Sequence, residues 1–132
     1  MEDTDMLKIL YCTSRDFRFQ DEKLPTKGEI EEHWQELPGW VVKYLLEDGL
    51  NREEPFEEIY RRMNHYDTNP LAVQYPFKGL LTTSTGQEWM KANGVGHTSM
   101  SMGDIIVVNG HDDTKNGYYY CMSIGFDKIH SI

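Results

Sequence analysis

The most patterned stretch of the chain, "HTSMSMGDIIVVNGHDDTKNGYYYCMSIGFDKI" (residues 97–129), decides the fold. Its apolar run 105–108 predicts a buried strand, and the polar run after it predicts a turn. A second strand is predicted over 118–124, so that residues 104–124 form a hairpin with a long loop. Gly125 interrupts the pattern, and the residues after it predict a last short strand.

The remaining chain adds one strand and several helices. Residues 6–12, "MLKILYC", predict an opening strand. Apolar residues recur at helical spacing in three segments of 26–63, and a short helix is predicted around Trp89 and Met90. This order of elements predicts an α+β fold, with a small antiparallel sheet, a C-terminal hairpin and three to four packed helices. A chain of 132 residues is expected to form a single domain, residues 1–132.

The first predicted helix carries the clearest start signal. Thr26 and Glu29 have the spacing of a capping box, in which each side chain accepts a hydrogen bond from a free backbone N–H. Ile30, Trp34 and Leu37 follow at helical spacing. The pattern predicts that the helix continues to Leu37 with these three side chains on its buried face.

The net charge of −9 is distributed unevenly along the chain. Up to Glu58 there are 16 acidic and 7 basic residues, whereas the rest of the chain has 6 of each. This excess argues against direct binding to nucleic acid or to an anionic membrane, because lysine and arginine bind such ligands. It favours a basic protein partner, and it also fits a solvated face that only keeps the protein soluble.

Several features indicate a cytoplasmic protein. No apolar run approaches the length of a membrane span, and the N-terminal "MEDTDM" is acidic, unlike a signal peptide. Cys12 and Cys121 both lie in apolar, strand-like runs. They are expected to be two buried free thiols in a reducing cytosol.

No set of residues predicts catalysis. His97, His111 and His130 lack the short spacing of zinc ligands, and "HDDTKNG" (111–117) lacks the repeating oxygen ligands of a calcium loop. Cys121 lies in a strand that reads as packed, whereas reactive thiols need an exposed, electropositive setting. The sequence therefore predicts no enzyme, no metal and no cofactor.

The Ser-x-Ser-x-Gly-Asp motif has two interpretations. In the structural one, the serines fix a turn, Gly103 takes a positive φ, and Asp104 closes the turn as a hydrogen-bond acceptor. In the functional one, Ser99, Ser101 and Asp104 form an exposed cluster that binds a partner or a small ligand.

Three consecutive tyrosines occupy the second strand of the hairpin. Side chains alternate along a strand, so Tyr119 is predicted on one face and Tyr118 and Tyr120 on the other. One face is expected to be core and the other to be a candidate exposed aromatic patch. Tyr118 and Tyr120 are thus predicted partner-binding residues, because tyrosine buries much area with few rotatable bonds.

The C-terminal half, about 57–129, resembles the small YodL-like domains of phage, plasmid and other mobile-element proteins. Two blocks carry the resemblance: the helix "EEIYRRMN" (57–64), and then the serine–Gly-Asp motif, the apolar strand after it, Tyr119, Tyr120, Cys121, Gly125 and Phe126. Residues 82–97 look like an insertion between the blocks. The resemblance implies a mobile-element gene that works in bacterial cytoplasm, and it implies no secure enzymatic role.

Together these observations predict a non-enzymatic binding protein. Its concrete form is an acidic, stoichiometric antagonist of a host defence or nucleic-acid-handling protein, with acidic helices occupying a basic channel of that host protein. The alternative is a small-ligand or nucleotide-binding β module that uses the serine–Gly-Asp motif. The predicted partner-binding glutamates are Glu29, Glu32, Glu36, Glu53, Glu57 and Glu58.

Overall fold

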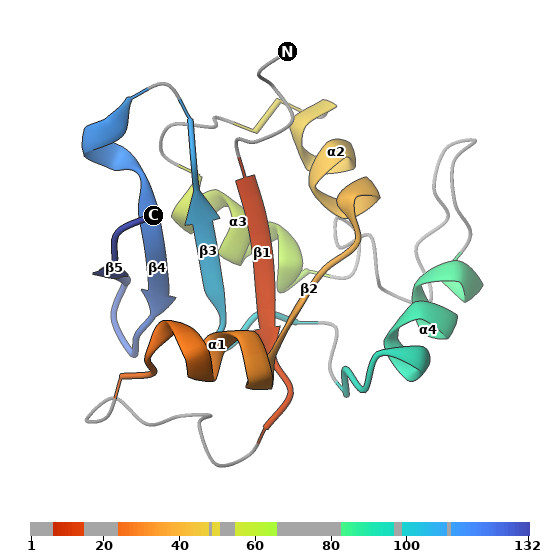
Figure 1. Cartoon of the computed structure of the whole chain (residues 1–132). Helices are drawn as coiled ribbons and strands as arrows, with labels where there is room; N and C mark the ends of the chain where they lie inside the picture. Colours follow the sequence, from red (N-terminus) through yellow and green to blue (C-terminus); the bar gives the residue numbers. More distant parts are fainter. Residues whose placement is uncertain are drawn as a thin grey trace.

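A computed structural model gives the architecture of the chain. It describes residues 7–14, 24–47, 49–50, 55–65, 83–96, 99–110 and 112–132. The elements in chain order are β1 (Leu7–Cys12), α1 (Lys27–His33), β2 (Trp34–Glu36), α2 (Gly39–Glu47), α3 (Phe56–Met63), α4 (Thr83–Ala92), β3 (Ile105–Val108), a 3-10 turn (Asp113–Lys115), β4 (Gly117–Cys121) and β5 (Phe126–His130). Within these residues, five strands form one antiparallel sheet in the order β2-β1-β3-β4-β5 (Figure 1). The predicted α+β fold with a C-terminal hairpin is confirmed.

The predicted strand 105–108 is the centre of the sheet. All four side chains of β3 are buried, which explains the unbroken apolar run in the sequence. Ile106 lies opposite Ile9 of β1 on one side and opposite Tyr119 of β4 on the other. The strand therefore bridges the two ends of the chain.

Helices cover both faces of the sheet (Figure 1). On one face, α2, α3 and α4 pack Val41, Ile59 and Met90 into a cluster that includes Ile9 and Ile106. Helices α2 and α3 show the apolar spacing that predicts them, because only one stripe of each helix meets the sheet. We refer to this side as the three-helix face.

The opposite face of the sheet is covered by α1. Ile30 of α1 and Trp34 of β2 pack there against Leu10, Ile105 and Tyr120. The core therefore consists of two apolar layers with the sheet between them.

The first helix is shorter than the sequence predicts. It ends at His33, and the next residues form the strand β2, in which Trp34 lies opposite Cys12. The indole N–H of Trp34 also donates to the carbonyl of Gly103 at 2.7 Å. Strand pairing and this buried bond outweigh the helical spacing, and Leu37 consequently packs on the three-helix face rather than beside Ile30.

The serine–Gly-Asp motif ties three strands together, and the predicted positive φ of Gly103 and acceptor role of Asp104 are confirmed. Gly103 has a positive φ of 96°, and Asp104 is fully buried. One carboxylate oxygen of Asp104 accepts from the backbone N–H of Cys12 at 2.9 Å, and the other accepts from the N–H of Ser101 at 2.8 Å. The backbone N–H of Cys121 donates to the Asp104 carbonyl at 2.9 Å. A single residue therefore fixes the ends of β1 and β4 beside the start of β3.

Replacement of Asp104 should strongly destabilise the fold. Asp104→Ala removes the carboxylate that accepts from one buried and one partly buried N–H group, and we expect a loss of about 3 kcal/mol in the free energy of unfolding. The exposed Asp127→Ala is the matched control, with an expected change within about 0.5 kcal/mol. Urea denaturation at neutral pH measures both variants. Equal stabilities for the two variants would contradict this role of Asp104.

Candidate functional site

The predicted acidic residues do not gather on one surface. Glu29 and Glu32 lie on α1, whereas Glu57 and Glu58 lie on α3 across the sheet (Figure 1). Glu36 lies on β2 at an edge of the described sheet. The predicted acidic helices therefore do not form one flank of the molecule: the glutamates are close in sequence, but the sheet separates α1 from α3.

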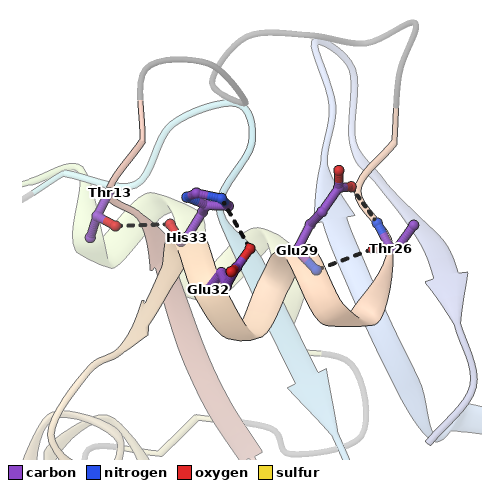
Figure 2. Close-up of polar contacts among 5 residues, drawn as sticks. All are labelled: Thr13, Thr26, Glu29, Glu32 and His33. Carbon is purple, nitrogen blue, oxygen red and sulfur yellow. Dashed lines mark hydrogen bonds and ion pairs between the residues drawn. The ribbon is translucent and has the colours of Figure 1, made fainter.

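Glu29 and Glu32 of α1 contact neighbouring residues of the same segment (Figure 2). The Glu29 carboxylate accepts from the backbone N–H of Thr26 at 2.9 Å, and the Glu29 N–H donates to the Thr26 hydroxyl at 3.1 Å. The predicted capping box is thus confirmed. Glu32 lies 3.5 Å from the ring of His33, whose carbonyl accepts from the hydroxyl of Thr13 at 2.9 Å. Glu29 is therefore occupied by an intrahelical bond.

Of the two remaining predicted glutamates, the structure describes only Glu36, which contributes little to a site. Glu36 lies 4.0 Å from the ammonium group of Lys8, and both side chains are about half exposed. An exposed pair at this distance is only weakly stabilising. Glu53 lies outside the described residues.

Adjacent glutamates at the start of α3 differ sharply. Glu58 binds Arg61, and it accepts from the Nε of Arg62 at 2.7 Å. These two hydrogen bonds, with Arg62 the larger cause, hold the pKa of Glu58 below its ordinary value. Glu57 is exposed and has no ion-pair partner among the described residues. Of the two, only Glu57 presents a carboxylate that no other described residue pairs with.

Glu57 borders a groove of about 300 Å³ between α3 and the turn that joins β4 to β5. The described residues that line the groove are Glu57, Tyr60, Cys121, Met122, Ser123, Gly125 and Phe126. Tyr60 is 42% exposed, and Ile124 at the tip of the turn is 90% exposed. The groove therefore combines aromatic and apolar walls with one acidic group.

Aromatic contacts between α3 and the sheet build this groove. The ring of Phe56 lies 4.3 Å from Tyr119 and 5.6 Å from Phe126. Tyr60, one turn further along α3, meets the ring of Phe126 edge-on at 6.4 Å. Gly125 has a φ of 74°, and its carbonyl accepts from the N–H of Met122 at 2.9 Å, which closes the tight turn.

The sequence did not single out Tyr60, Ile124 or Phe126 as site residues. Tyr60 appears in the helical apolar spacing, and Phe126 appears only in the family resemblance. The contact that joins them depends on how α3 packs on the sheet, which no local pattern encodes. The exposure of Ile124 follows from the turn around Gly125, and a turn signal alone does not reveal it.

The predicted tyrosine patch is corrected in part. Tyr119 does face away from Tyr118 and Tyr120, as the strand alternation predicts. Tyr120, however, is fully buried because α1 and β2 cover that face of the sheet. Tyr118 is half-buried, with the ammonium group of Lys27 5.3 Å from its ring centre. Tyr120 cannot contact a partner in this fold.

The predicted ligand cluster is not assembled at the surface. Ser99 is exposed and Ser101 is half-buried, but Asp104 is fully buried and both of its carboxylate oxygens accept backbone N–H groups. The carboxylate therefore points into the fold rather than toward a ligand.

Other chemical features of the described residues are few. No group of three or more histidine, cysteine or acidic side chains among them is placed to hold a metal ion. Cys12 and Cys121 are buried free thiols, as predicted. None of the described helices has the length and apolarity that crossing a bilayer requires.

Comparison of the chain with protein-family models, curated proteins and solved structures gave no match. The resemblance to YodL-like domains stays a prediction from the residues that carry it.

The paired carboxylate of Glu58 should make stability depend on pH. Because its pKa is lower in the folded protein than in the unfolded chain, the pairing stabilises the fold above about pH 4.5 and is lost as the pH falls through the folded pKa. Glu58→Gln should therefore lower the free energy of unfolding at pH 7 by up to about 1 kcal/mol and flatten its fall in acid.

Glu57→Gln is the matched control for this measurement. Both glutamates lie in the first turn of α3, so they share the favourable interaction with the helix dipole. The difference between the two variants isolates the pairing with arginine. Denaturant titrations at pH 7 and pH 3 provide the comparison, and identical pH profiles for the two variants would contradict it.

Proposed function

We propose that this chain is a non-enzymatic binding protein of a phage or other mobile element, which acts in the bacterial cytoplasm. Its partner is a host protein, and in its concrete form it is a stoichiometric antagonist of a host defence or nucleic-acid-handling protein. Neither nucleic acid nor a membrane is a direct ligand in this proposal.

The observation that carries the proposal is the exposed apolar rim of the α3 groove. Tyr60, which is 42% exposed, lines the groove together with Phe126, and Ile124, which is 90% exposed, lies between the lining residues Ser123 and Gly125 in the β4–β5 turn. Exposed apolar side chains surrounded by polar residues are typical of protein interfaces. Tyrosine is enriched among the interface residues that contribute most to binding. The groove therefore supports a protein partner.

Two further features support the antagonist form. The helix 57–64 and the segment around Gly125 and Phe126, on which the mobile-element resemblance rests, both border the groove. The net charge of −9 favours a partner with a basic surface, such as one that handles nucleic acid. A bound acidic protein then competes with the phosphate backbone for that surface.

The alternative, a small-ligand or nucleotide-binding β module, has no comparable support. Of its predicted contacts, Asp104 is fully buried and bonded to backbone groups. No described feature favours it over a protein partner.

The experiment captures a host partner on the immobilised protein and then titrates the protein into an activity assay of that partner. We expect activity to fall linearly to its minimum at a fixed molar ratio, because the protein acts by occupancy. Ile124→Ser removes the most exposed apolar side chain of the rim and should weaken binding about tenfold or more.

Ile132→Ser is the matched control because Ile132 is also exposed, at 50%, but lies outside the β4–β5 turn that borders the groove. It should leave the affinity unchanged. Loss of the partner's activity at far below molar equivalence would indicate catalysis and contradict the proposal. If the two isoleucine variants change the affinity equally, the groove is not the surface that binds the partner.

A further inference from the structure

We infer that the α3 groove receives an arginine side chain from the partner protein. This inference rests on the proposed function and specifies which chemistry of the partner the groove recognises. It follows from the charge, the aromatic walls and the size of the groove.

The charge of the groove calls for a cation. Glu57 is the only lining residue, among those the structure describes, with a carboxylate, and none of the others carries a positive charge. Its neighbour Glu58 is already paired with Arg61 and Arg62, and no described ion pair involves Glu57. A cationic side chain entering the groove would therefore meet an unpaired carboxylate, and a charge-assisted hydrogen bond to that group is stronger than a neutral one.

The aromatic walls favour arginine. Tyr60 and Phe126 both line the groove, with their ring centres 6.4 Å apart and their ring planes at 80°. A guanidinium group is planar, stacks on aromatic faces and is more weakly hydrated than an ammonium group. Its aliphatic stem can also lie along Met122 while its head reaches Glu57.

The size of the groove favours a single long side chain. Its volume of about 300 Å³ is at the lower limit of small-molecule sites. Ile124, 90% exposed between the lining residues Ser123 and Gly125, offers an apolar contact for the residue beside the arginine. A protein segment with arginine next to an apolar residue can contact both Glu57 in the groove and Ile124 beside it. A free polyamine has a cation for Glu57 but no apolar side chain for Ile124.

The test uses three capped pentapeptides, Gly-Leu-X-Leu-Gly, in which X is arginine, lysine or citrulline. Citrulline keeps the shape of arginine and removes its charge. Each peptide is titrated into the isotopically labelled full chain at low ionic strength, and backbone resonances of α3 and residues 121–126 report binding. We expect the arginine peptide to bind at least about fivefold more tightly than the citrulline peptide, with lysine between them.

Variants assign this preference to the groove. Glu57→Gln should abolish the difference between arginine and citrulline, whereas the adjacent Glu58→Gln should preserve it. Tyr60→Ala should weaken binding of the arginine peptide, and thermal melting confirms that each variant is folded. Spermidine should displace the arginine peptide only at much higher concentration.

Equal binding of arginine and citrulline, or a preference that survives Glu57→Gln, would overturn the inference. Displacement by spermidine at equal concentration would overturn it in favour of a free polyamine. If the captured partner still requires Ile124 but not Glu57, the proposed function stands and only the arginine inference fails.

Discussion

The contact of Phe56 with Tyr119 and Phe126 is the interaction on which the candidate site depends. Phe56 begins α3, Tyr119 lies in β4 and Phe126 begins β5, so three rings join a helix to two neighbouring strands. Each such aromatic pair contributes about 0.5–1.5 kcal/mol beyond the area it buries. Together with the fully buried Ile59 and Met63 of α3, this contact sets where Glu57 and Tyr60 lie over the β4–β5 turn.

A second constraint acts on the same turn from inside the fold. Gly103 and Asp104 exchange backbone hydrogen bonds with Cys121, each at 2.9 Å, and the Asp104 carboxylate holds the end of β1 beside them. The turn from Met122 to Gly125 begins directly after this fixed point. The serine–Gly-Asp motif thus has a structural role. It bonds to Cys121, which also lines the groove.

The sequence predicts the fold better than the site. The run 105–108, the capping box of Thr26 and Glu29, and the positive φ of Gly103 each depend on local chemistry, and all three are confirmed. The helical spacing places Trp34 in a helix, whereas Trp34 pairs with Cys12 of β1. This pairing joins residues far apart in sequence, so no local pattern predicts it. For the same reason, charge counting predicted one acidic flank, although the sheet separates Glu29 from Glu57. A site formed by long-range packing has no local signature.

A double-mutant cycle between Phe56 and Phe126 tests the central claim most directly. The free energy of unfolding is measured for the wild type, for Phe56→Leu and Phe126→Leu, and for the double variant. The account predicts that the two losses are not additive, with a coupling of about 0.5–1.5 kcal/mol, because each ring stabilises the other. Losses that add to within about 0.3 kcal/mol would show that α3 is not joined to the β4–β5 turn through these rings, and the groove would lose its structural basis.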